Sequence, residues 1–273
     1  MMVNERASYV IAGLNYLVPP TIRPRIYADE PPAGEKKNTA AFKSHSVMIA
    51  DARPTAAGLS LDREAFKLAR HCSRVRDFYD DDEVRRVYYA EAAVLIARES
   101  GANRVVLFDH TIRRRTPSDY AVSARSPVTS VHIDYTRESA PQRVRDLLGM
   151  EAEALLRRRF AIINAWRPLR APLRDAPLAM VDASTLSMDH LVAVDLIYPD
   201  RTGAVYYVTY DPAHRWFYVP SMDIDEVLIF KNYDSDPRPA GRFAAHAAFD
   251  DPTPWSTVVP RESIEVRALA FFQ

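Results

Sequence analysis

The sequence has little cysteine, little glycine and no net charge. Its 273 residues include one cysteine, Cys72, which excludes an intramolecular disulfide framework and a structural zinc site built from several thiolates. The 36 basic side chains are balanced by 36 acidic ones, so the chain lacks the basic field with which a dedicated nucleic-acid binder meets phosphates. With 7 glycines, a glycine-rich phosphate cradle is not expected either.

Long apolar runs are also missing. No stretch approaches the roughly 20 apolar residues of a membrane-spanning helix. Asn4, Glu5 and Arg6 stand where a secretory signal would need its basic start and apolar segment. We therefore expect a cytoplasmic protein with no membrane or nucleic-acid partner, and the sequence leaves its oligomeric state open.

Proline is plentiful, with 20 residues, and it divides the first part of the chain. Residues 1–40 show no periodicity and are expected to be irregular. From there to residue 117, the pattern mixes the two kinds of secondary structure. It predicts strands over 46–53 and 104–109 and helices over 62–78 and 83–99.

After residue 117, short runs rich in Val, Ile, Tyr and Phe follow one another, separated by Pro, Asp or Gly. A series of about eight such strands is typical of a sandwich or barrel, including the double-sheet jelly roll. We expect a single domain over 1–273, in the α+β class but mainly β, in which a mixed, partly helical part (1–117) flanks the β core (118–273). The strands are predicted over 129–135, 160–166, 191–198, 204–210, 214–219, 226–230, 242–249 and 263–272, with one helix over 139–157.

The first chemical signal is His132-Ile133-Asp134. On a strand, residues i and i+2 point to the same face, so the imidazole and the carboxylate can aim at one point. Two histidines and one carboxylate form the facial triad that leaves open positions on ferrous iron. The alternative is a surface strand with two polar residues facing solvent.

A third ligand must come from downstream, where His190, His214 and His246 are candidates. His246 is favoured because Arg261 and Ser263 follow it on the last predicted strand. An arginine and a hydroxyl on one strand face can hold a carboxylate through a forked salt bridge and a hydrogen bond. The co-substrate 2-oxoglutarate needs such an anchor for its distal carboxylate. Arg267 lies on the same face by parity and is the alternative anchor.

Other residues are candidates for contacts around this site. Asn164 and Trp166 share one strand face, so Asn164 can hydrogen-bond a keto acid while Trp166 forms a pocket wall. Arg167, Tyr135 and His110 are further candidates for substrate contacts. For Trp166 and Arg167 the alternative is a structural role in the core and in an ion pair, and for His110 it is a solvated basic turn.

These elements together resemble a family of Fe(II)/2-oxoglutarate oxygenases. The family includes the aspergillic-acid hydroxylase/desaturase (AsaB) and the cephamycin 7α-hydroxylation protein (CmcJ). The resemblance covers about half the chain, and 51–53 and 108–111 look similar less distinctively. The matching blocks are HIDYT (132–136), INAWRPL (163–169), HRWFY (214–218), DEVLIFK (225–231), AHAAFDDP (245–252) and RESIEVR (261–267).

The resemblance implies a double-stranded β-helix and an enzyme that uses iron, 2-oxoglutarate and O2. It implies His132, Asp134 and His246 as iron ligands, with Arg261 and Ser263 on 2-oxoglutarate. Such enzymes hydroxylate, desaturate or cyclise small natural products or amino-acid-derived molecules, and they release succinate and CO2. One departure is that Phe243-Ala244-Ala245 precedes His246, where the family has a more polar Thr-Pro.

Two other readings stay open at this stage. A cupin-like metal enzyme without 2-oxoglutarate would need the metal ligands but not Arg261. A non-catalytic jelly-roll binding module would need neither. Halogenation is disfavoured because the carboxylate of Asp134 would occupy the position that a halide needs.

Overall fold

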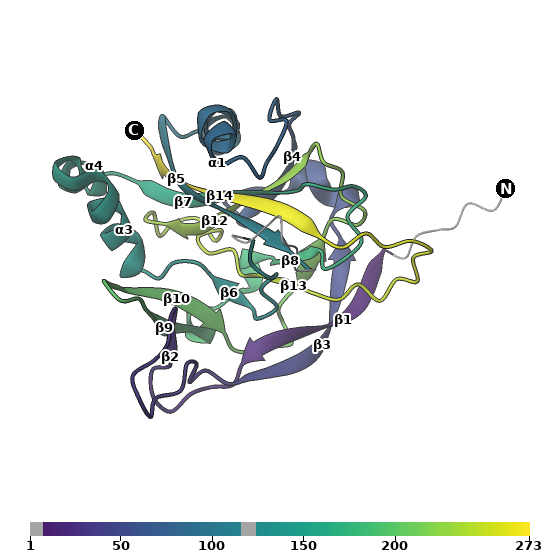
Figure 1. Ribbon diagram of the computed structural model, residues 1–273, viewed down its shortest axis with the longest axis horizontal. Coiled ribbons are helices and arrows are strands. Elements are labelled where there is room, and N and C mark those ends of the chain that lie inside the picture. The colour runs from purple at the N-terminus through teal and green to yellow at the C-terminus, as the bar shows by residue number, and fades with distance from the viewer. Residues whose placement is uncertain (1–7, 116–123) are drawn as a thin grey trace.

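The computed structural model describes residues 8–115 and 124–273, whose strands form two sheets (Figure 1). The boundary predicted at residue 117 lies outside the described residues. The first sheet has nine strands in the order β1-β3-β11-β8-β13-β6-β10-β9-β2. In chain order these are β1 (Tyr9–Leu17), β2 (Arg25–Tyr27), β3 (Phe42–Asp51), β6 (His132–Ile133), β8 (Leu178–Val181), β9 (Leu191–Ile197), β10 (Thr202–Val208), β11 (Trp216–Tyr218) and β13 (His246–Ala248).

The second sheet has five strands in the order β4-β12-β7-β14-β5. Its central strands are buried along almost their whole length because both of their faces are covered. Ile162 and Leu269 pack in a core cluster shared with the first sheet. Their neighbours Ile163 and Ala268 pack on the opposite side. The strands are β4 (Phe66–Arg70), β5 (Arg104–Arg114), β7 (Phe160–Pro168), β12 (Glu226–Asp234) and β14 (Glu262–Phe271).

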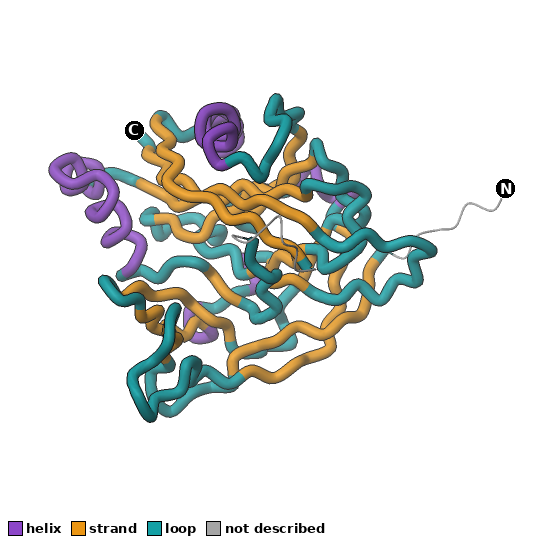
Figure 2. Tube along the Cα trace, viewed as in Figure 1, coloured by secondary structure: helices purple, strands orange, loops and turns teal. Residues whose placement is uncertain are grey.

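A helical segment covers the outer face of the second sheet (Figures 1 and 2). It runs through α1 (Asp81–Glu83), a π-helical turn η2 (Val84–Tyr88) and α2 (Tyr89–Ser100). The Asp80 carboxylate accepts from the backbone N–H of Glu83 and caps its start. Gly101, with φ +74°, ends it in the left-handed conformation that glycine adopts without strain. The helix predicted over 83–99 is therefore confirmed.

The remaining helices are short and connect strands. The predicted helix over 139–157 is present in pieces. No helix within the described part of the chain combines the length and the apolarity that crossing a bilayer requires. The remaining segments are α3 (Ser139–Leu148), η4 (Gly149–Glu151), α4 (Ala152–Leu156), and the 3₁₀ turns η1 (Arg53–Gly58), η5 (Ala183–Thr185) and η6 (Met188–His190).

The helix predicted over 62–78 is wrong. Phe66–Arg70 is strand β4, in which Leu68 lies opposite Leu228 of β12. Ala65, directly before it, has φ +65°, a conformation that no helix contains. Pairing with an adjacent strand overrides the local helical periodicity here.

The irregular segment predicted over 1–40 is also wrong in part. β1 pairs with β3 along its whole length, and its residues Leu14 and Tyr16 are buried. Strand β8 was not predicted. Each of the eight strands that were predicted after residue 117 corresponds to a strand of the structure. The chain is mainly β, with the two sheets of a double-stranded β-helix and few helices, as predicted.

Candidate active site

Two short central strands bring together three side chains that could hold a metal ion. β6 and β13 are neighbours in the first sheet, and His132 lies directly opposite His246. Nε2 of His132 lies 3.6 Å from Oδ1 of Asp134, and Nε2 of His246 lies 4.0 Å from the same oxygen. One ligand atom from each residue lies within 4.8 Å of the other two. His190 and His214 are not part of this group.

Both imidazoles are oriented by the backbone two residues before them. Nδ1 of His132 donates to the carbonyl of Ser130 at 2.8 Å, and Nδ1 of His246 donates to that of Ala244 at 3.0 Å. A carbonyl only accepts, so Nδ1 carries the proton and Nε2 keeps its lone pair. Burial, and then the nearby His246, lower the pKa of His132 to about 4, and burial also lowers the pKa of His246. Two neutral imidazoles thus present free lone pairs to one point.

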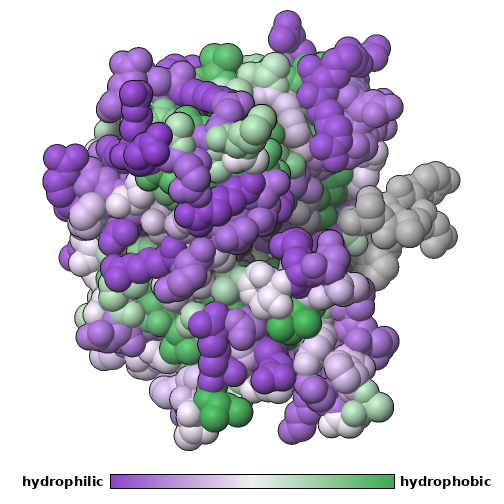
Figure 3. Space-filling model, turned by 90° about the vertical axis from the view of Figure 1, so that its left-hand side faces the viewer, coloured by the Kyte–Doolittle hydropathy of each residue, from purple (hydrophilic) through white to green (hydrophobic). Residues whose placement is uncertain are grey.

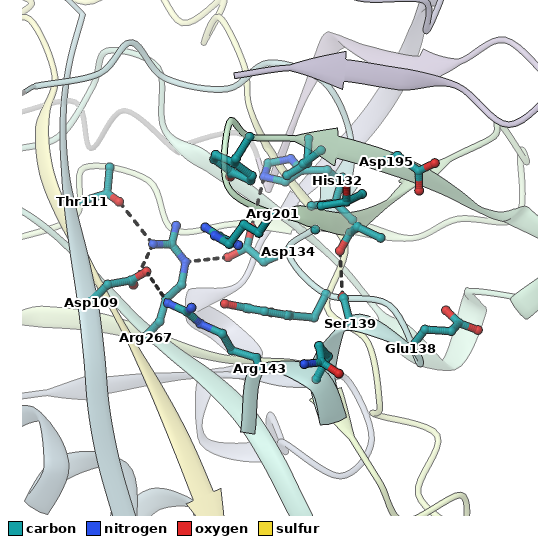
Figure 4. A pocket seen from close by; sticks show the side chains of 18 of the residues that line it. Asp109, Thr111, His132, Asp134, Glu138, Ser139, Arg143, Asp195, Arg201 and Arg267 are labelled. Carbon is teal, nitrogen blue, oxygen red and sulfur yellow. Dashed lines mark hydrogen bonds and ion pairs between the residues drawn. The ribbon is translucent and has the colours of Figure 1, made fainter. Parts of the chain in front are cut away.

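Asp134 is held from three directions. Its Oδ2 accepts a hydrogen bond from Nε of Arg267 at 3.0 Å (Figure 4). The same oxygen accepts from Nδ2 of Asn164 at 2.9 Å, and the backbone N–H of Asp134 donates to Oδ1 of Asn232 at 2.9 Å. Burial alone would raise the pKa of Asp134, but the charge of Arg267 and the hydrogen bond that it donates hold the pKa well below its usual range. The carboxylate is therefore ionised, as a metal ligand must be.

Arg267, the alternative anchor for 2-oxoglutarate, is already paired within the chain. Besides Asp134, its guanidinium contacts Asp109 at 3.0 Å and Thr111 at 3.2 Å (Figure 4). Glu265 lies 3.5 Å away. Burial opposes the charge of Arg267, but Glu265 and Asp134 raise its pKa well above the usual value. Its contacts orient Asp134.

Arg261 has different surroundings on the same strand face. It is 2% exposed, its Nε donates to Ser263 Oγ at 3.0 Å, and its Nη1 donates to the carbonyl of Ala176 at 2.8 Å. Its guanidinium lies over the ring of Trp166, 5.0 Å from the centroid. Within the described residues it forms no ion pair with a carboxylate. Burial, and then the charge of Arg113, lower its pKa to about 9.

Such a guanidinium is costly unless an anion compensates its charge. The partners of the Arg261 guanidinium are a hydroxyl, a carbonyl and an aromatic ring, none of which carries negative charge. The surroundings of Arg261 therefore fit a small carboxylate.

Glu265 contacts Asn164 and Asn232 contacts Asp134, and neither Glu265 nor Asn232 was predicted from the sequence. Glu265 is 5% exposed and accepts from Nδ2 of Asn164, and burial followed by the charge of Asp134 keeps its pKa raised. Strand parity could have identified Glu265, because every second residue of a strand lies on the same face. That face carries Arg261, Ser263, Glu265 and Arg267. No such signal existed for Asn232.

Two buried polar atoms beside Asp134 lack partners in the described part of the chain. They are Oδ1 of Asn164 and Nδ2 of Asn232. Buried amide atoms without hydrogen bonds are rare in folded proteins. This observation fits a bound group next to the three ligand atoms.

A cavity of about 910 Å³ opens beside His132 and Asp134. Tyr135 and His110, both selected from the sequence, line it. Trp166 does not, because it is 1% exposed in an apolar core cluster. Arg167 lies on the opposite strand face, where it bonds the carbonyl of Ile224.

Hydrophilic side chains cover much of the face in Figure 3, and hydrophobic ones are scattered in small groups. Cys72 is exposed and unpaired with another cysteine.

Comparison with known proteins finds relatives that match most of the chain. A family model described as "Oxidoreductase/YMDC permease-like domain" matches residues 14–271. The chain is 33% identical over 253 residues to the Fe(II)/2-oxoglutarate-dependent dioxygenase nvfI of Aspergillus novofumigatus, covering 90% of each chain. It is 32% identical over 255 residues to the hydroxylase/desaturase efuI of Hormonema carpetanum, covering 85% of each.

A third relative is the hydroxylase/desaturase asaB of Aspergillus flavus, which is 37% identical over 142 residues, 47% of this chain and 62% of that protein. Among solved structures, the iron and alpha-ketoglutarate-dependent endoperoxidase NvfI superposes with a TM-score of 0.90 at 29% identity. That match covers 98% of this chain and 99% of NvfI.

Proposed function

This chain belongs to the hydroxylase/desaturase family of Fe(II)/2-oxoglutarate-dependent oxygenases, and we propose that His132, Asp134 and His246 are its iron ligands. It is an enzyme that uses Fe(II), 2-oxoglutarate and O2 to oxidise a small molecule. The proposal for the ligands depends on one observation: Nε2 of two imidazoles and a carboxylate oxygen converge within 4.8 Å. Two nitrogens and one oxygen are a donor set that suits non-haem Fe(II).

When bound, iron supplies, with 2-oxoglutarate and O2, the oxidative attack on a C–H bond that accompanies conversion of 2-oxoglutarate to succinate and CO2. The residues of the chain supply placement. The carbonyls of Ser130 and Ala244 keep both imidazoles in the metal-binding tautomer. Arg267 keeps Asp134 ionised and fixes the direction of its free oxygen.

Arg261 and Ser263 are proposed to hold the distal carboxylate of 2-oxoglutarate. The support is a buried guanidinium whose protein partners are all uncharged, beside a hydroxyl on the same strand face. The position of Asn164, whose Nδ2 donates to Asp134 at 2.9 Å, supports a role at the metal-bound end of the keto acid. The alternative assignment to Arg267 is less favoured because Arg267 already contacts two carboxylates.

The prime substrate is proposed to enter the cavity lined by Tyr135 and His110 and to undergo hydroxylation, desaturation or cyclisation there. Trp166 and Arg167 are less favoured as substrate contacts because they lie outside this lining.

We also propose one functional domain over 1–273, a cytoplasmic location, and no nucleic-acid or membrane partner. The balanced charge supports the absence of a nucleic-acid partner.

The test is iron-dependent succinate formation from 2-oxoglutarate by the purified protein, with and without replacement of each proposed ligand. Turnover that requires all three residues supports the assignment. Metal binding without affinity for 2-oxoglutarate would instead indicate a cupin-like enzyme. Binding of neither would indicate a non-catalytic jelly-roll module.

A further inference from the structure

The arginines that line the cavity differ in whether the chain neutralises them. Arg267 pairs with Asp134 and Asp109, and Arg23 pairs with Asp195 at 2.5 Å. Arg113, Arg125 and Arg201 line the same cavity and form no ion pair with any described residue, although Arg201 lies over the ring of Tyr198. The cavity therefore contains three positive charges without an ion-pair partner among the described residues, and two of them, Arg113 and Arg125, are neighbours.

The backbone holds these two arginines side by side. Arg113 of β5 is the bridge partner of Arg125. The N–H of Arg114 donates to the carbonyl of Arg125 at 2.9 Å, and the N–H of Arg125 donates to that of Ile112 at 3.0 Å. Nη1 of Arg113 is further fixed by the carbonyl of Ser126 at 2.9 Å. Their proximity is thus set by backbone pairing.

Two adjacent like charges destabilise a strand pair, and the cost grows where one of them is removed from water. Burial lowers the pKa of Arg113, and Arg267 and Arg125 act in the same direction, while the charges of Glu265 and Asp134 oppose them. An anion bound between Arg113 and Arg125 would remove this cost and would gain charge-assisted hydrogen bonds.

The other residues that line the cavity indicate which molecule carries the anionic group. Val128, Leu196 and Val205 add apolar surface to the same cavity. Arg125 is exposed, unlike the deeply buried Arg261 to which the proposed function assigns 2-oxoglutarate. Building on that proposed function, we infer that the prime substrate is a carboxylic acid with an apolar body, whose carboxylate is bound by Arg113 and Arg125.

The test compares an aromatic acid with its uncharged analogue. The protein is loaded with Mn(II) and 2-oxoglutarate and titrated calorimetrically with 2-naphthoate and with 2-naphthamide. The wild type should bind the acid at least about tenfold more tightly than the amide, as expected for a charge-assisted bond. Arg113→Gln and Arg125→Gln should each remove this preference without weakening the amide, and Arg125→Lys should retain most of it.

Arg238→Gln is the matched control, because Arg238 is exposed, pairs with Asp236 and does not line the cavity. It should behave as the wild type does. Equal binding of acid and amide, or no binding of either, overturns the inference. So does a weaker affinity for 2-oxoglutarate in Arg125→Gln with an unchanged preference for the acid.

Failure of the proposed function would appear separately, as absence of 2-oxoglutarate binding to the Mn(II)-loaded wild type. If Arg113→Gln does not fold, the binding preferences of Arg125→Gln and Arg125→Lys test the inference, because Arg125 is exposed.

Discussion

Two clusters in this chain each contain two histidines and one aspartate, and they differ in what the ring nitrogens face. In the site cluster (His132, Asp134 and His246), both Nδ1 atoms are occupied by backbone carbonyls, and both Nε2 atoms point toward the carboxylate. In the relay cluster (His190, Asp211 and His214), the rings bond to each other. Nε2 of His214 and Nδ1 of His190 are 3.2 Å apart.

The two remaining ring nitrogens of the relay cluster also have partners within the protein. Nε2 of His190 lies 3.1 Å from Asp211, and Nδ1 of His214 lies 3.3 Å from the hydroxyl of Tyr16. All four ring nitrogens have protein partners, so none is left for a metal. The comparison teaches that the competence of a histidine pair to bind metal depends on the partner of its second nitrogen rather than on residue type.

The largest effect is expected when side chains of the two clusters are replaced. His132→Ala, Asp134→Ala and His246→Ala should each abolish detectable iron-dependent succinate formation, because two ligands cannot maintain the facial geometry. His190→Ala and His214→Ala should retain turnover. Full activity of His246→Ala together with loss of activity in His214→Ala would show that the third ligand was assigned incorrectly.

The second prediction concerns Arg261, directly before β14, and Arg267 within it. Arg261→Ala should raise the KM for 2-oxoglutarate by about one to two decades, since a charge-assisted bond contributes about 1.5–3 kcal/mol. Arg267→Ala should act mainly on iron affinity, because Arg267 orients Asp134. Steady-state kinetics at varied 2-oxoglutarate, with iron titrations on the same variants, separates the two effects, and the opposite pattern would exchange the two roles.

A smaller effect on metal affinity is expected when Asn232 is replaced. Its Oδ1 accepts a hydrogen bond from the backbone N–H of Asp134. Asn232→Leu leaves that N–H without its partner, so metal affinity should fall by about 10–100-fold while the ligands stay in place. Titration with Mn(II) measures this. Wild-type affinity in the variant would mean that Asp134 is held sufficiently by Arg267 and Asn164.

The smallest effect is expected on stability, in the relay cluster. His214→Phe leaves the Tyr16 hydroxyl without one partner and should lower the free energy of unfolding by about 1–3 kcal/mol, with turnover per folded molecule unchanged. Urea titration of the variant and the wild type measures the difference.

The same variant has a pH signature. Burial, and then His190, lower the folded-state pKa of His214 to about 4, below its ordinary value of 6.5. The unfolded chain therefore binds a proton that the folded chain does not, and stability falls as the pH drops from about 6.5 to about 4. His214→Phe should show a shallower loss in this window, and an equally steep loss would assign the dependence to other groups.

The sequence determined the parts of this protein that depend on local spacing. His132 and Asp134 share a face because side chains alternate along any strand, and Arg261 and Ser263 share one for the same reason. The helix capped by Asp80 and ended by Gly101 could be predicted because its signals are local. The strand at Phe66–Arg70 could not, because only pairing with β12 makes it a strand.

Tertiary structure decided which distant residues meet. Three histidines were candidates for the third position, and only the pairing of β13 with β6 brings His246 opposite His132. Glu265 and Asn232 entered the site in the same way, through strands remote in sequence from Asp134. Spacing along a chain fixes the direction of neighbouring side chains, whereas contacts across sheets depend on strand order and register, which no local pattern encodes.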